Sequence, residues 1–182
     1  MNGALLLGIV LGISILGLVA AYLLASWVMR RKVGDEAMQR ISNAIKEGAE
    51  AFLKRQNRTI LVLAGAVAVL LFVGYGFLRQ HREWDPVGSS MQFAIWITLS
   101  FVFGALCSVF AGYIGMWVSI RANIRTATAA LSSLNDALRI ALRGGAVSGL
   151  MVVAMSLFGV GGLYAIVSAV GGVEPTKIPL LT

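Results

Sequence analysis

The sequence lacks ionisable side chains along four long apolar stretches. Asp, Glu, Lys, Arg and His are absent from all of them, which run over about 3–29, 59–78, 91–120 and 144–173. Ionisable groups inside a bilayer are costly, and where they occur they mark ion paths or proton relays. Their absence predicts that the four stretches are a scaffold, and that any conducting part of the protein lies outside these 182 residues.

Proline, charge and cysteine are also scarce. The placement of the prolines allows unbroken helices, the low charge excludes a soluble domain, and the single cysteine excludes a disulfide-stapled fold. The prolines at 86, 175 and 179 all lie outside the apolar stretches, as unbroken helices require. Charged residues make up 13% of the chain, about half the ~25% of a soluble domain, whereas hydrophobic residues make up 58%. Cys107 is the single cysteine, so the chain has no internal disulfide framework.

Each apolar stretch is long enough to cross a membrane as a helix. A helix needs about 20 residues to cover ~30 Å of hydrocarbon at a rise of ~1.5 Å per residue. The shorter alternating segments of a β-barrel are not seen. The basic cluster at 30–32 follows the first stretch, which predicts an uncleaved anchor whose N-terminus is outside. The fold class is therefore predicted to be an all-α membrane protein with four transmembrane helices.

The basic residues are sorted by connector, which predicts the orientation. Eight Lys and Arg residues lie in 30–58, two in 79–90, four in 121–143 and one, Lys177, in the tail. Basic connectors face the cytoplasm, so both termini are expected outside the cell. The same sorting explains the formal net charge of +7 without nucleic acid as a partner.

The first cytoplasmic connector has the pattern of an amphipathic helix over about 36–58. Asp35 is a suitable N-cap, and apolar residues recur at helical spacing at Met38, Ile41, Ile45, Ala49 and Phe52. No proline separates this helix from the second apolar stretch, which predicts one continuous helix from about 36 to 79. Its first part would project roughly 30 Å into the cytoplasm. Alternatively, it lies on the lipid headgroups. Residues 1–182 are predicted to form a single transmembrane region.

Small residues predict where helices approach each other closely. Gly104, Ser108 and Gly112 recur every four residues, and we expect this stripe to contact another helix of the chain. Similar pairs occur at Gly8 and Gly12 and at Gly145 and Gly149. The third helix is expected to continue past the membrane through Arg125, and the run 132–136 is expected to cap the fourth.

No catalytic, cofactor-binding or metal-binding residue is predicted, because no metal cluster, catalytic triad or phosphate loop is present. His81 is expected to be solvated in an outer loop. Arg121 and Arg125 lie one helical turn apart, and two guanidiniums on one face could hold a phosphate or a carboxylate. Alternatively, they are stop-transfer charges that contact lipid headgroups. Glu47 and Glu50 are interpreted as exposed charges rather than as acids or bases.

Three blocks resemble the N-terminal part of the membrane-bound, ion-translocating pyrophosphatases. Residues 47–56 read EGAEAFLKRQ and are followed by Thr59-Ile60, and 112–116 read GYIGM before RANIRTA at 121–127. The third block is ALRGGAV at 141–147, with Ala137-Leu138 before it and Gly149 after it. Order and spacing agree over roughly residues 1–175. Asn57 and Ser148 depart from the family pattern, where an aromatic residue and Met are common.

The resemblance implies a sixteen-helix homodimer with both termini outside, in a prokaryotic cell (inner) membrane. Such proteins hydrolyse pyrophosphate with several Mg²⁺ ions, and they drive H⁺, or in some members Na⁺, out of the cytoplasm. The resemblance also suggests K⁺ as a second cofactor. The family's catalytic groups lie on the fifth helix and beyond, so this chain looks like an N-terminal fragment. Its four helices correspond to an outer ring that supports the catalytic helices, and the fragment alone is expected to be inactive.

A second hypothesis is a complete four-helix membrane anchor or assembly subunit without enzymatic activity. The balanced topology and the helical arm at 36–58 support it, but it does not explain three family blocks in order. A reading frame that continues beyond Thr182 into a Tyr-Thr-Lys-Ala-Ala-Asp-like motif would favour the pump.

Overall fold

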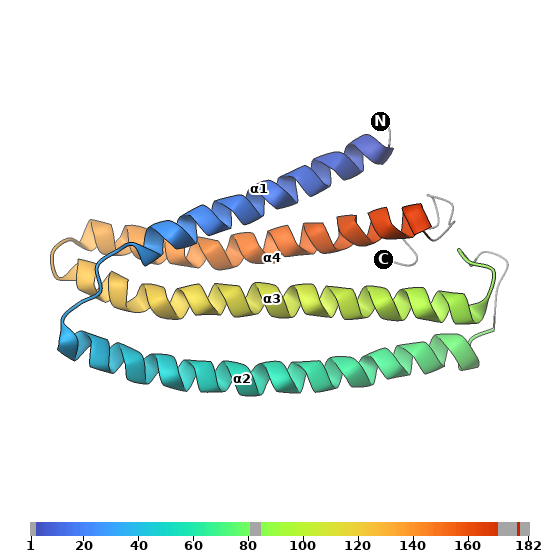
Figure 1. Cartoon of the computed structure of the whole chain (residues 1–182), viewed down its shortest axis with the longest axis horizontal. Helices are drawn as coiled ribbons and strands as arrows, with labels where there is room; N and C mark the ends of the chain where they lie inside the picture. The colour runs from blue at the N-terminus through green and yellow to red at the C-terminus, as the bar shows by residue number, and fades with distance from the viewer. Residues whose placement is uncertain (1–2, 81–84, 171–177, 179–182) are drawn as a thin grey trace. The chain divides into compact units, whose positions relative to one another are not determined.

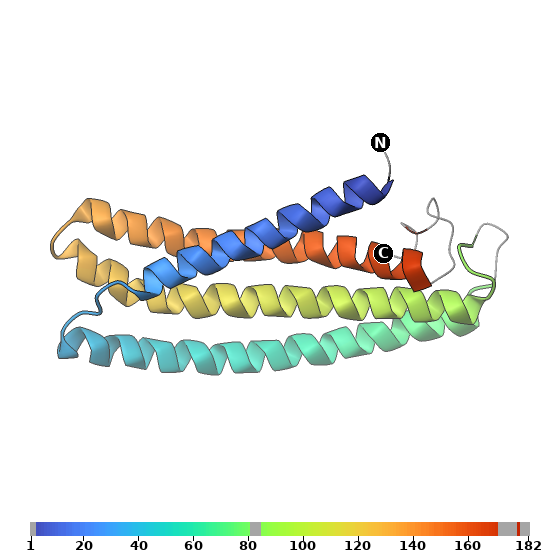
Figure 2. The same cartoon turned by 45° about the horizontal axis from the view of Figure 1, so that its top comes forward.

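A computed structural model of the chain describes residues 3–80, 85–170 and 178. The elements are α1 (Gly3–Met29), α2 (Glu36–Val73), a π-helical turn η1 (Gly74–Leu78), α3 (Ser90–Ala130) and α4 (Leu134–Val170) (Figures 1 and 2). No strand occurs within the described ranges. All four α-helices are long and apolar enough to cross a membrane, which confirms the predicted fold class. His81 and the tail at 173–177 lie outside the described residues.

The second helix begins and ends as its local sequence dictates. The Met38 N–H donates to Asp35 Oδ1 over 2.9 Å, so Asp35 is the predicted N-cap. The α-helix then runs unbroken to Val73, where the wider η1 turn follows and the Arg79 N–H donates to the Gly74 carbonyl over 3.0 Å. Two glycines, the weakest helix formers after proline, lie in this turn. No break therefore separates residues 36–58 from the second apolar stretch.

The third helix extends beyond its apolar stretch, and the fourth begins after a short turn. α3 continues through Arg125 to Ala130, as predicted. The Asp136 N–H then donates to Ser133 Oγ over 3.2 Å, which makes Ser133 the cap of α4 within the predicted run 132–136. The boundaries of the membrane within these helices, and the single region 1–182, stay predictions.

The described residues pack as two compact units. The first unit is formed by 1–12, 58–108 and 156–182, and the second by 13–57 and 109–155. In the first unit, buried residues from α3, α4 and the flanking loops form one core of Val87, Phe93, Val167 and Ile178. Tyr75 and Tyr164 pack against this core.

In the second unit, small side chains allow α1, α3 and α4 to approach closely. Its two cores are formed by Ala21, Ala111, Val118, Val147 and Met151 and by Val28, Ala122 and Ile140. A Cβ atom added at Gly115 of α3 would lie 3.2 Å from the Ser148 Cα of α4, and one added at Gly17 of α1 would lie 3.1 Å from the Ala154 Cβ. Glycine at these positions lets the helices approach this closely.

The predicted contact stripe on α3 is wrong. A Cβ atom added at Gly104 or Gly112 would have no described atom within 4 Å, and the same holds for the pairs on α1 and α4. The buried positions are instead Ala111 and Gly115. Ala111 lies one residue before the stripe position Gly112, and one residue rotates a helix by about 100°. Gly115 lies four residues after Ala111 and therefore on the same face as Ala111. Both faces carry small residues, so spacing alone could not distinguish them.

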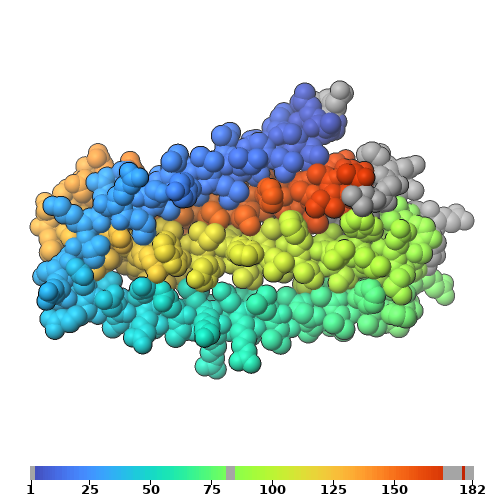
Figure 3. Space-filling view, viewed as in Figure 1, coloured from blue at the N-terminus to red at the C-terminus, as the bar shows by residue number. Residues whose placement is uncertain are grey.

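The apolar part of α2 keeps much of its side-chain surface exposed, as the space-filling view shows (Figure 3). Its exposed fractions range from 50% to 71% at Leu61, Val62, Leu63, Val69 and Leu70. A water-exposed surface of this composition would be strongly unfavourable. Lipid or further helices are therefore expected to cover this part of α2.

Candidate functional site

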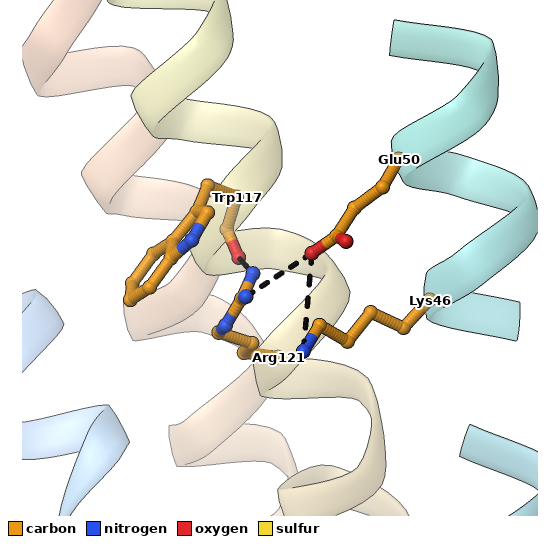
Figure 4. A network of polar contacts seen from close by, with 4 residues as sticks. All are labelled: Lys46, Glu50, Trp117 and Arg121. Carbon is orange, nitrogen blue, oxygen red and sulfur yellow. Dashed lines mark hydrogen bonds and ion pairs between the residues drawn. The ribbon is translucent and has the colours of Figure 1, made fainter. Parts of the chain in front are cut away.

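The polar side chains of the second unit form a network that links its four helices. Arg121 of α3 donates through Nη2 to Glu50 Oε1 of α2 over 3.2 Å and through Nη1 to the Trp117 carbonyl over 3.2 Å (Figure 4). Lys46 Nζ lies 3.9 Å from the same Glu50 oxygen. The Arg121 guanidinium also lies over the Trp117 ring, 3.9 Å from its centroid. The network therefore joins α2 to α3.

Arg125, one turn further along α3, holds the end of α1. Its Nε and Nη2 both donate to the Met29 carbonyl, over 3.3 and 3.1 Å, and its Nη1 donates to the Arg121 carbonyl over 2.6 Å. The last carbonyls of a helix have no partner within the helix, and a cation also complements the negative end of the helix dipole. Arg125 is therefore the C-terminal cap of α1, supplied by another helix.

The two arginines thus lie on one face, as predicted, and each binds a different group of the unit. One binds the Glu50 carboxylate and the other a backbone carbonyl. Glu50 is an exposed charge, as predicted, and its carboxylate pairs with both Arg121 and Lys46. Its side chain is 49% exposed, so each ion pair contributes only about 0–1 kcal/mol.

Trp27 adds a link between α1 and α4. The Arg31 guanidinium lies 3.6 Å from its ring centroid and the Arg143 guanidinium 3.8 Å. Arg31 lies four residues after Trp27, and this spacing could have predicted its contact. No signal in the sequence could have paired Trp27 with Arg143 of α4.

Among the described residues of the first unit, Arg79 and Asp85 form an ion pair that the sequence did not reveal. Arg79 donates through Nη1 and Nη2 to the two Asp85 oxygens over 3.0 and 2.5 Å, and Asp85 is buried. The Arg79 guanidinium also lies 4.6 Å from the centroid of Phe93. The hydrogen bond to Asp85 raises the pKa of Arg79 above its ordinary value. This pair ties the end of η1 to the loop before α3.

The described acids do not converge on a metal site. No group of three or more His, Cys, Asp or Glu side chains within the described ranges could hold a metal ion. Asp35 caps α2, Glu50 pairs with Arg121 and Asp85 pairs with Arg79. Several Mg²⁺ ions with a diphosphate require a convergent set of oxygen ligands. The acids that the structure describes do not fit such a site.

These observations define a class: an integral, multi-pass membrane protein whose four apolar helices are tied by arginine contacts at their polar ends. The sequence model of the family described as inorganic H⁺ pyrophosphatase matches residues 15–180. The chain belongs to this family, which confirms the resemblance noted in the sequence.

Curated relatives show the same family and also how much of it the chain covers. The K⁺-insensitive pyrophosphate-energized proton pump of Caldanaerobacter subterraneus is 44% identical over 91% of this chain and 23% of that relative. The K⁺-insensitive pyrophosphate-energized proton pump 2 of Moorella thermoacetica is 43% identical over 91% of the chain and 22% of its own length. The putative K⁺-stimulated pyrophosphate-energized sodium pump of Bacteroides thetaiotaomicron is 34% identical over 86% of this chain and 20% of its own length. The chain thus spans about a fifth of the length of these relatives. No solved structure matches it.

Proposed function

We propose that this chain is the N-terminal, supporting part of a pyrophosphate-energised proton pump. The observation that carries the proposal is the family match over residues 15–180. In the whole pump, hydrolysis of pyrophosphate would drive H⁺ across the membrane, with Mg²⁺, and K⁺ in some members, bound by residues that this chain does not supply. The Caldanaerobacter and Moorella proton pumps are more similar to the chain than the Bacteroides sodium pump, at 44% and 43% against 34% identity, which favours H⁺ as the ion.

The role of these four helices follows from what their side chains do. Glu50 and Asp85 pair with arginines, whereas Asp35 and Arg125 cap helix ends. A proton path needs relay groups inside the membrane, and none is present in the four apolar stretches. We therefore assign the chain a buttressing role, as outer-ring helices of a sixteen-helix fold. The whole pump would be a homodimer in a prokaryotic cell membrane, with both termini of this chain outside.

The alternative is a complete four-helix anchor or assembly subunit. The four helices and the helical arm at Glu36–Val73 also suit it. This reading does not explain the sequence identity to the pyrophosphate-energized proton pumps, and we place it second.

A chimera tests the proposal. The matching segment of the Caldanaerobacter pump is replaced by this chain, and pyrophosphate-driven acidification of membrane vesicles is measured. We expect pumping to be retained, because a support needs conserved packing rather than conserved chemistry. The positive control carries the Moorella segment, and the negative control lacks the segment altogether. A chimera that is inserted in the membrane but does not pump, beside a working Moorella chimera, would contradict the proposal.

A further inference from the structure

A small basic cleft lies in the second unit, between the first turns of α2, the polar end of α3 and the connector that joins α1 to α2. Its volume is about 170 Å³. The polar residues that line it are Gln39, Ser42, Asn43, Lys46, Arg121 and Arg125. We propose that this cleft binds a phosphate group, and the geometry points to the phosphate of an anionic phospholipid headgroup as its source.

Charge carries the first step of the argument. Among the described residues, three cations and no acid line the cleft. Glu50 does not line the cleft but pairs with two of its cations, and it neutralises one charge because Arg121 and Lys46 share the same carboxylate oxygen. The cleft therefore keeps about two net positive charges after the ion pairs shown in Figure 4 are counted.

The second step is the supply of hydrogen-bond donors. Lys46 Nζ lies 3.9 Å from Glu50, which is too far for a hydrogen bond. Each Nη of Arg121 uses one N–H, for the Trp117 carbonyl and for Glu50, and each carries a second one. Arg125 is held rigidly by three hydrogen bonds to backbone carbonyls, so its position is fixed before a ligand arrives. Fixed cationic donors of this kind are the groups that bind phosphate oxygens.

The third step is the depth of the α3 side of the cleft relative to the membrane. Arg121 is the first charged residue after the apolar stretch 91–120. Trp117 and Trp27 lie within one turn of the polar ends of their apolar stretches, and aromatic rings of this kind favour the headgroup level. A phosphate at that level is most abundant in lipid. The inference depends only on this chain and the membrane, and not on pump activity.

Native mass spectrometry of the purified 182-residue chain in detergent tests the inference. Phosphatidylglycerol and phosphatidylcholine are titrated separately, and inorganic phosphate is titrated by calorimetry. We expect one phosphatidylglycerol to bind more tightly than phosphatidylcholine, because a choline cation opposes the charge of the cleft. If inorganic phosphate binds and the lipid does not, the cleft takes free phosphate, and the inferred phosphate chemistry stands. If neither phosphatidylglycerol nor phosphate binds, the inference is overturned.

Matched variants tie the binding to this cleft. Lys46→Gln should weaken phosphatidylglycerol binding about fivefold, the loss expected for one basic residue beside a phosphate. Lys54→Gln removes the same charge two turns along α2, at a residue that does not line the cleft, and should change affinity less than twofold. Glu50→Gln should tighten binding, whereas Glu47→Gln should not.

Equal losses for Lys46→Gln and Lys54→Gln would mean that binding follows net charge alone, and would overturn the inference. Lys46 is 39% exposed, so its replacement should leave the fold intact. If Lys46→Gln disrupts the fold, the Glu50→Gln variant tests the inference instead. Tighter phosphatidylglycerol binding by Glu50→Gln supports the inference, and unchanged or weaker binding overturns it.

Discussion

The close approach of α3 and α4 in the second unit predicts that two neighbouring glycines respond in opposite ways to the same substitution. At Gly115 a new Cβ atom would lie 2.8 Å from Ser148 Oγ and 3.2 Å from its Cα, whereas at Gly112 it would meet nothing within 4 Å. Both residues lie within α3. Gly112→Ala and Gly115→Ala are therefore a matched pair that differs only in the facing contact.

The change in stability of each variant has two parts, one that both variants share and one that is specific to Gly115→Ala. Replacing a helical glycine by alanine stabilises a helix by roughly 0.5–1 kcal/mol, and this part is common to both variants. Overpacking against a neighbouring backbone costs roughly 1–3 kcal/mol and applies to Gly115 alone. For a protein of this size, 1 kcal/mol corresponds to roughly 2–4 °C in Tm. We expect the Tm of Gly115→Ala to lie about 2–12 °C below that of Gly112→Ala.

The assay is thermal unfolding of the purified chain in one detergent at one scan rate, because irreversible unfolding makes Tm depend on the rate. Adding Ser148→Gly to Gly115→Ala removes the Oγ and Cβ contacts and should recover part of the loss. Equal Tm values for the two alanine variants, or a higher value for Gly115→Ala, would refute the packing of α3 on α4 described above.

Three further predictions concern the ends of the helices. Arg125→Gln removes the cap of α1 and should lower the stability by about 1.5–3 kcal/mol, the value of hydrogen bonds from a charged donor, measured as a fall in Tm. Asp85→Asn should cost a similar amount, because it leaves the Arg79 guanidinium without its anionic partner. For orientation, a cysteine introduced at Gly88 should react with an impermeant maleimide added to sealed cells, and one introduced at Ala37 should not.

Each of these predictions has its own control. Arg40→Gln and Asp136→Asn change the same residue types at exposed positions, and their Tm values should stay near that of the unaltered chain. If they fall as far as those of Arg125→Gln and Asp85→Asn, charge alone explains the loss. Cys107 is buried and should add little background labelling. Labelling at position 37 in sealed cells would reverse the proposed orientation.

The helices themselves could be predicted from the sequence because their signals are local. The apolar stretch 3–29 coincides with α1, and the caps Asp35 and Ser133 lie where capping residues precede a helical pattern. These features depend on residues within one or two turns of each other. The length and apolar character of the stretches then dictate the class of protein.

The contacts between helices could not be predicted, because they join residues far apart in the chain. Arg125 and Met29 are 96 residues apart, and Arg121 and Glu50 are 71 apart. The glycine stripe on α3 was assigned to the wrong face, because small residues occur on two faces and only the partner helix selects one of them. The resemblance of three short blocks identified the family. Hydrophobic periodicity alone would not have distinguished a pump fragment from a four-helix anchor.

The measurement that tests the central claim most directly is Mg²⁺-dependent release of phosphate from pyrophosphate by the purified 182-residue chain in lipid. A supporting role predicts no turnover above background, because Glu50 and Asp85 pair with arginines and no group of described acids converges on Mg²⁺. Turnover well above background that is lost in Glu47→Gln or Glu50→Gln would contradict the account, because it would place the hydrolytic site within this chain.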